Sequence, residues 1–389
     1  MAFSLVLAAR DLLGSHDTFS VGHPPAVDMG RVAQYRVPVG SVCAARPEQR
    51  VQGPFGPFRR PRSPCQGRRL PGDAGGAEGR PEPGGRRSGE VDAVLRPVVV
   101  GLDGSRESLA AAEWAAGEAL RRGLPLRLVH AWEGLESDTS QLPELEAPRY
   151  WARRILRGAM DQLNERHPQV YLSAEQIARP AADALVEAGA EAELLVLGSR
   201  AFSGFGGFMA GSVALATVAR VARPVVLVRA DRTAEDDHLP DAEGRPSLRT
   251  PYRDVVVGVD IAHPCEELLA FAFESAALRS ARLQVLHTWH VPYAPPAAAA
   301  TMSAAAQQAA ETAVDAALQP WREKYPTVKV RTLVENGRPA QQLLHATQDA
   351  GLLVVGRRNR PARLGSHTGP VAHAVMHHVR CPVVIVPHD

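Results

Sequence analysis

The stretch Arg96-Pro-Val-Val-Val-Gly-Leu-Asp103 returns later in the chain as Arg253-Asp-Val-Val-Val-Gly-Val-Asp260. Three further stretches return in the same order: 128–132 as 285–289, 194–200 as 352–358, and 223–228 as 381–386. A repeat this long is a whole domain, because solenoid units have periods of roughly 20–50 residues. The sequence therefore predicts two related domains, and each copy serves as a control for the other.

Each copy alternates apolar runs with segments of helical period. Runs that predict buried strands in the first copy lie at 98–102, 126–131, 194–197 and 224–228, and a more exposed strand is expected at 169–177. Helices are expected at 105–122, 150–167, from Pro180 onward, and at 212–222, with a long Ala-rich helix at 297–318 in the second copy. This alternation predicts parallel β-α-β units with right-handed crossovers.

The chain is expected to divide into four parts. Residues 1–92 hold a stretch dense in Arg, Gly and Pro without strand or helix period, which predicts a disordered extension or sequence upstream of the true start, with Val91 as one candidate start. The alternative is a basic arm for anionic partners. Residues 93–230 form the first domain, 231–252 an acidic, proline-bearing linker, and 253–389 the second domain.

Composition excludes several classes of partner. The net charge of +2 gives no argument for nucleic-acid binding, and no apolar run reaches the roughly 20 residues that span a bilayer. The four cysteines show neither a disulfide framework nor metal-ligand spacing. The sequence therefore favours a cytoplasmic protein without a metal site; His373 and His377 stand four apart, but no zinc motif surrounds them.

Residues suited to an anion gather after two of the predicted strands. The first strand ends in Gly-Leu-Asp103-Gly-Ser, and the fourth leads through a glycine-rich loop to Gly211-Ser212-Val213 at a helix start. Ligands of open parallel sheets bind at the carboxyl ends of strands, and a helix N-terminus offers free N–H groups to phosphate. Ser212 is expected to cap this helix or to donate to the phosphate. Neither a Gly-x-Gly-x-x-Gly fingerprint nor a Gly-Lys-Ser/Thr loop is present.

These motifs together resemble the universal stress protein family. The resemblance rests on Val-Val-Val-Gly-x-Asp-Gly-Ser, Leu-x-x-Val-His-Ala, and the loop Gly-x2-Gly-x9-Gly-Ser before a Pro-Val-Val strand, and it covers both repeats from about residue 94. It implies two tandem Rossmann-like (HUP-type) α/β domains, each a five-stranded parallel sheet of order 3-2-1-4-5 flanked by helices. One branch of the family binds ATP with this loop, and another lacks the loop and does not.

The resemblance assigns the binding residues of the first domain. Asp103 and the backbone of Ala131 would face adenine and ribose, and the phosphates and ribose would be held by Gly198, Gly211, Ser212 and Val213. Ala201 stands where the family has its second glycine. Its methyl group is tolerable only in a backbone region open to L residues, so weakened binding is expected.

The second domain departs further from the pattern. Asp260 and Thr288 match the adenine side and Gly356 is present, but Asn359 replaces the second glycine and Gly369 is followed by Pro370. Proline offers neither an N–H nor a hydroxyl group to a phosphate, so a degenerate site is expected. The alternative is that arginines compensate by contacting the phosphates directly: Arg357, Arg358, Arg360 and Arg363.

The terminal strands, 224–228 and 382–386, would lie at sheet edges in the family order. Uncovered edges invite pairing, so an internal pseudo-dimer of the two domains is expected, with a further homodimer open.

The leading functional hypothesis is a tandem universal stress protein that binds ATP, with or without Mg²⁺, as a regulatory ligand in its first domain. A nucleotide-free stress or interaction protein is the alternative. An enzyme, such as a slow ATPase or another α/β hydrolase, ranks lowest because no nucleophile and base recur beside Asp103.

Overall fold

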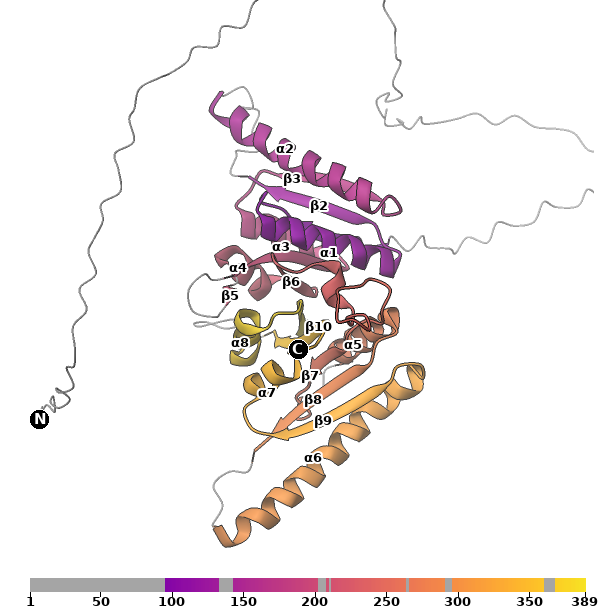
Figure 1. Cartoon of the computed structure of the whole chain (residues 1–389). Coiled ribbons are helices and arrows are strands. Elements are labelled where there is room, and N and C mark those ends of the chain that lie inside the picture. Colours follow the sequence, from indigo (N-terminus) through magenta and orange to yellow (C-terminus); the bar gives the residue numbers. More distant parts are fainter. Residues whose placement is uncertain are drawn as a thin grey trace, which may run out of the picture. The chain divides into compact units, whose positions relative to one another are not determined.

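The computed structural model describes residues 95–132, 143–201, 208–209, 211–263, 266–290, 296–359 and 368–389 (Figure 1). The chain divides into two units, Met1–Gly85 and Arg86–Asp389, and all the described residues belong to the second. The expectation for residues 1–92 lies outside the described part.

The first repeat alternates strands and helices from β1 to β6. Its elements are β1 (Val98–Gly101), α1 (Arg106–Arg122), β2 (Leu126–Ala131), α2 (Pro143–Arg166), β3 (Leu172–Ile177), α3 (Ala181–Ala190), β4 (Leu194–Ala201), β5 (Phe208–Met209), α4 (Ser212–Arg220) and β6 (Val225–Arg229).

The second repeat follows the same order. After a 3-10 helix, η1 (Ala234–Asp237), its elements are β7 (Val255–Gly258), α5 (Glu266–Arg279), β8 (Leu283–Trp289), α6 (Pro296–Lys324), β9 (Val330–Asn336), α7 (Pro339–Ala346), β10 (Leu352–Arg358), α8 (Pro370–His378) and β11 (Val383–His388).

Local signals in the sequence account for the ends of α1. The Ser105 hydroxyl accepts a hydrogen bond from the N–H of Ser108, which satisfies one donor of the first turn. Gly123 closes the helix in the left-handed conformation, with φ of 64°, and donates to the carbonyls of Ala119 and Leu120. The helix expected at 105–122 is therefore present, and Ser105 is its N-cap.

Several predicted boundaries were wrong by a few residues. The strand expected at 169–177 begins only at Leu172, because the chain turns at residues 168–170. Pro180 is the N-cap of α3 rather than its first helical residue. The helix expected at 297–318 continues to Lys324.

The strands form one sheet of order β3-β2-β1-β4-β6-β11-β10-β7-β8-β9, with the short strand β5 paired to β4 (Figure 1). Within each repeat the neighbouring strands of this path are parallel, so both halves show the expected order 3-2-1-4-5. Strands β6 and β11 pair antiparallel, with Val226 opposite Val384. The predicted α/β fold class is confirmed.

Helices cover both faces of the sheet, and each face has its own apolar core. The first core joins the β1 residues Val98 and Val100 to side chains of α1, α2, α5 and α6. The second joins Val99, on the opposite face of the same strand, to α3, α4, α7 and α8. Each core runs through both repeats, so the sheet is buried on two sides as its continuous Val and Leu runs predict.

The predicted linker, 231–252, is folded against the sheet rather than extended. Asp237 is buried, pairs with Arg232 at 3.0 Å, and accepts a hydrogen bond on its carbonyl from the N–H of Arg253. His238 and Tyr252 form a β-bridge, and their ring centroids lie 3.9 Å apart. Asp237, an acidic residue of this segment, thus has a structural partner.

A buried ionic cluster joins the two repeats between α1 and α5. The carboxylate of Glu118 accepts from Arg122 at 2.7 Å and from Arg279 at 2.6 Å, and Arg121 is a third partner at 3.1 Å. Burial by itself raises the pKa of Glu118, but attraction from the three guanidinium groups outweighs burial and leaves this pKa far below its ordinary value.

In the described part of the chain, none of the helices has the length and apolar character needed to cross a membrane.

Candidate functional site

The carboxyl ends of β1 and β4 lie side by side at the point where the strand order reverses. Strand β1 pairs with β2 on one side and with β4 on the other. The chain leaves β1 toward α1 and leaves β4 toward α4, on opposite faces of the sheet. Such a switch point opens a crevice between the two connections, which is where ligands of open α/β sheets bind.

The turn after β1 is held by hydrogen bonds of Asp103. Its Oδ1 accepts from the N–H of Ser105 at 2.9 Å and also from the Ser105 hydroxyl. Gly104 lies between them with φ of 81°, a region that side chains disfavour. The Asp103 side chain is exposed at this strand end. The turn therefore presents a carboxylate at the edge of the crevice.

Strand β2 extends beyond the carboxyl end of β1. The carbonyl of Val129 accepts from the N–H of Leu102, the last such bond to β1, while Trp132 donates to Ile177 on the β3 side. Because backbone groups alternate along a strand, the N–H and C=O of Ala131 point toward the β1 side, past the strand's end. His130 Nδ1 lies 2.7 Å from the Leu102 carbonyl and secures this arrangement.

The same geometry recurs in the second repeat. His287 Nδ1 lies 3.1 Å from the Val259 carbonyl, and Val259 donates to Leu286. The backbone of Thr288 therefore occupies the place of Ala131. The ends of β2 and β8 are therefore held by equivalent contacts in the two repeats.

Packing requires glycine at position 198, and this reason for the glycine could not be inferred from the sequence. A Cβ at this position would lie 2.5 Å from the carbonyl carbon of Glu107 and 2.7 Å from the amide nitrogen of Ser108. Both are backbone atoms of the first turn of α1, which cannot move aside cheaply. Gly198 thus lets α1 approach β4, whatever else it does for a ligand.

Ala201 is the last residue of β4 and pairs with Phe208 of β5. Among the described residues only Ser280 has a positive φ outside glycine, so Ala201 lies in a region open to L residues. The backbone of Ala201 is therefore in a region where its methyl group is tolerated. The loop residues 202–207 and 210 lie outside the described part.

The N-terminus of α4 is open on the crevice side. Gly211 is the N-cap, with φ of −60° and ψ of 160°, and Ser212 and Val213 are exposed. The expectation that Ser212 caps the helix is wrong: it is the first helical residue, and a residue inside the helix cannot take the N-cap position. A Cβ at Gly211 would meet no atom of the described residues within 4 Å.

In the second repeat, the corresponding side chains form hydrogen bonds and ion pairs with residues of the same repeat. Asp260 accepts from Arg358 at 2.7 Å and lies 3.2 Å from His263. The side chain of Asn359 donates to the carboxylate of Asp389 at 3.1 Å. Pro370 is the first residue of α8, as expected, so this helix start lacks an N–H group there.

The idea that arginines compensate in the second repeat is wrong for Arg357. This side chain is buried and donates to the carbonyls of Ala219 and Val221, in the first repeat. Its strand neighbour Arg358 points to the other face and pairs with Asp260. Arg360 and Arg363 lie outside the described residues.

Gly356 and Gly369 complete the candidate residues of this repeat. A Cβ at Gly356 would lie 2.7 Å from Nε2 of His388, the end of a side chain. Gly369 is the N-cap of α8, with φ of −62° and ψ of 161°, nearly the conformation of Gly211. The two helix starts therefore form a matched pair that differs in Ser212 against Pro370.

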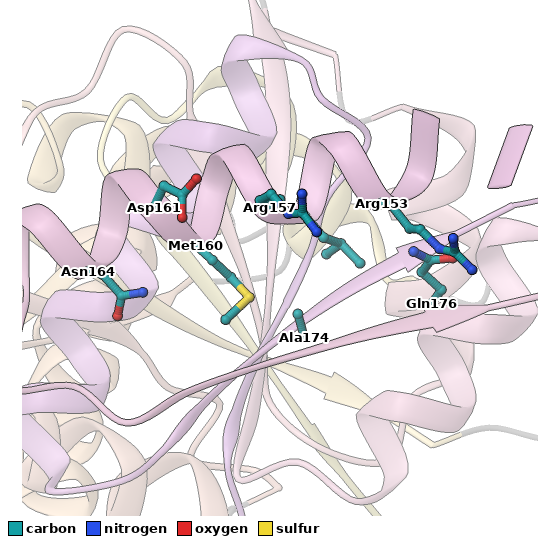
Figure 2. A pocket seen from close by; sticks show the side chains of 8 residues that line it. Arg153, Arg157, Met160, Asp161, Asn164, Ala174 and Gln176 are labelled. Atoms are coloured by element: carbon teal, nitrogen blue, oxygen red, sulfur yellow. The ribbon is translucent and has the colours of Figure 1, made fainter. Parts of the chain in front are cut away.

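Two surface hollows lie away from the switch point. One, of about 630 Å³, runs between α2 and β3; Figure 2 shows Arg153, Arg157 and Asp161 on the helix above Ala174 and Gln176 of the strand. The other, of about 540 Å³, lies between α7 and strands β8 and β9. Neither is lined by a residue assigned to the nucleotide.

The residues that join the repeats were missed at the sequence level. Glu118 and Arg122 lie on the buried face of α1, where Ala111 and Ala115 precede them at helical spacing. A charge on an apolar helix face is a signal of a buried pair. The partner, Arg279, could not be found from the sequence because it lies in the other repeat.

Known proteins match this chain over both repeats. A family model described as the universal stress protein family matches residues 95–229 and again residues 251–387. A universal stress protein of Mycobacterium tuberculosis is 32% identical over 298 residues, which cover 74% of this chain and 96% of that protein. One of Mycolicibacterium smegmatis is 30% identical over 302 residues, with 74% and 96% covered.

A solved structure shares the fold. The crystal structure of a universal stress protein from Archaeoglobus fulgidus aligns with a TM-score of 0.50 at 13% identity, and the match covers 76% of this chain and all of that one. At this identity the likeness concerns the arrangement of strands and helices alone.

Proposed function

Because this chain belongs to the universal stress protein family, we propose that it acts in the stress response and binds ATP as a regulatory ligand in its first repeat. The adenine and ribose lie against Asp103 and the backbone of Ala131. The phosphates lie at the N-terminus of α4, on Gly211, Ser212 and Val213. The ATP binds with or without Mg²⁺ on its phosphates.

The open N-terminus of α4 is the observation that carries this proposal. Neither the backbone conformation nor any described neighbour requires glycine at position 211. In the proposed site, glycine at this position leaves the N–H groups of the first turn accessible to a phosphate. Free donors and the positive end of the helix dipole together favour an anion at this place.

The second repeat does not bind nucleotide in this proposal. Its Asp260 is held by Arg358, its Asn359 holds the C-terminus, and Pro370 removes both a backbone donor and the hydroxyl group. One ATP per chain follows. Binding at the second site would need the Asp260–Arg358 pair to open first.

The two repeats act as an internal pseudo-dimer in the cytoplasm, and a further homodimer is open to the chain. The antiparallel pairing of β6 with β11 supports the pseudo-dimer, because it places the two copies edge to edge in one sheet. The free, buried Cys381 is in keeping with a reducing compartment.

ATP is a ligand here rather than a substrate turned over rapidly. Asp103 accepts hydrogen bonds from the Ser105 amide and hydroxyl groups, which hold the turn after β1, and this structural role favours binding over turnover. ATP hydrolysis above background that is lost in Asp103→Asn would instead favour a slow ATPase.

The test is nucleotide stoichiometry with a matched pair of variants. Purified protein is denatured and its nucleotide measured by chromatography, and ATP binding is measured by calorimetry. Gly211→Val is expected to abolish binding, and Gly369→Val, at the same backbone conformation in the other repeat, to leave it unchanged. Absence of both bound nucleotide and a calorimetric signal would leave the nucleotide-free interaction protein.

A further inference from the structure

A buried arginine of each repeat binds the C-terminal end of the other repeat's last helix. Arg229, at the end of β6, donates to the carbonyl of Met376 at 2.7 Å and to that of Val379 at 2.9 Å, where α8 ends. Its side chain is 2% exposed, and burial lowers its pKa to about 10, so it stays charged at neutral pH.

The contact is returned from the second repeat. Arg357, the next-to-last residue of β10, donates to the carbonyl of Val221 at 2.7 Å and to that of Ala219 at 3.3 Å, where α4 ends. The two arginines are not equivalent in the repeat: Ser199 occupies the place of Arg357, and Pro387 that of Arg229. The reciprocity therefore arises from the packing and could not be read from the repeat itself.

These carbonyls need a partner from outside the helix. The last carbonyl groups of a helix have no donor within it, and leaving them buried and unpaired is unfavourable. Helix α4 has only nine residues, so its two ends are close together and it moves as one body. Its N-terminus is the proposed phosphate site, and its C-terminus rests on Arg357.

We propose that Arg357 of the second repeat is a positioning residue for the phosphate site of the first, which makes nucleotide affinity depend on the contact between the repeats. The inference rests on the proposed function, since it concerns the same site. Phosphates and Arg357 stabilise one short helix from opposite ends. Because such coupling is reciprocal, bound ATP in turn strengthens the contact of Arg357 with α4.

Comparing the affinities of the variants for ATP and for adenosine tests this role. In the full chain, Arg357→Met is expected to weaken ATP binding roughly tenfold, about 1.4 kcal/mol, and to weaken adenosine binding much less, because adenosine lacks the phosphates that bind the N-terminus of α4. Arg357→Lys, which keeps one donor, should recover part of the affinity. The control is Arg279→Met, which removes a contact between the repeats at Glu118, far from α4. It should lower thermal stability without changing ATP affinity.

Hydrogen exchange on the unaltered protein supplies a second test. The N–H of Val221 donates to Thr217 in the last turn of α4. Saturating ATP should slow exchange of the peptide that spans this turn at least severalfold. Adenosine should not.

The outcomes separate the two proposals. The positioning role would be overturned if Arg357→Met bound ATP with normal affinity, or if it lost affinity equally for ATP and adenosine. It would also be overturned if ATP did not change hydrogen exchange at the C-terminal end of α4. Failure of the unaltered protein to bind ATP would overturn the nucleotide site itself. Should Arg357→Met not fold, Arg357→Lys and the exchange measurement decide the matter.

Discussion

Replacing Glu118 with glutamine should destabilise the joined repeats more than any surface change. The substitution keeps the shape of the side chain but removes the negative charge that the guanidinium groups of Arg122 and Arg279 share. The side chains of Glu118, Arg122 and Arg279 are 1%, 3% and 4% exposed. Glutamine accepts with one atom only, so at least one guanidinium would be left without its charged partner.

The magnitude follows from burial. Removing one partner of a buried ion pair costs about 3–5 kcal/mol, because a charge is left uncompensated away from water. Arg122 keeps a partner in Glu274 at 3.1 Å, which is half exposed, whereas Arg279 keeps a hydrogen bond to the carbonyl of Ser275. Loss of 3–5 kcal/mol in a chain of this size corresponds to a lower melting temperature by roughly 5–15 °C.

Urea unfolding and calorimetry of the full chain measure this effect. The control is Glu187→Gln, which breaks the exposed ion pair with Arg179, whose partners are 54% and 45% exposed. Exposed pairs contribute about 0–1 kcal/mol, so this control should change little. A Glu118→Gln variant within about 1 kcal/mol of the unaltered protein would refute the view that the cluster holds a compensated buried charge.

Two further predictions concern buried positions. Gly198→Ala should lower the free energy of unfolding by at least about 1–3 kcal/mol through overpacking, since the added Cβ would press on the backbone of Glu107. Gly356→Ala should lower it less, because the side chain of His388 can move away. Equal urea midpoints for the two variants would contradict this prediction. Burial raises the pKa of Cys381 to about 12, so in the folded protein this thiol should react with maleimide at pH 8 at least about a hundredfold more slowly than in urea, followed by peptide mass spectrometry. The same shift stabilises the fold fully below the ordinary cysteine pKa of about 9, and this contribution should be lost as pH rises toward 12.

The fold could be predicted because its signals are local and occur twice. The run at 98–102 is apolar on both faces, as expected for a strand between two helix layers, and the structure has a strand there. The hydroxyl group of the cap Ser105 and the left-handed conformation of Gly123 mark the two ends of α1. The family resemblance stated from these motifs is confirmed by the matches over both repeats.

The candidate site was predictable only in part. Asp103 and Ala131 were placed at strand ends by the β-α-β pattern, and the structure brings both to the switch point. The cause of Gly198 was not predictable, because a glycine needed for close packing and one needed for a phosphate look alike in a sequence. Ser212 was misread as a cap because Gly211, one residue earlier, takes the N-cap position.

The sequence by itself determined the order of elements and the presence of two copies, since each follows from residues near one another in the chain. Only the tertiary structure decided what holds the copies together and what each buried arginine does. Arg357 and Arg358 are neighbours in sequence, yet one binds the end of α4 and the other pairs with Asp260. Alternate residues of a strand face opposite sides of the sheet, and the partners on those sides come from segments about a hundred residues away, set by packing rather than by local pattern.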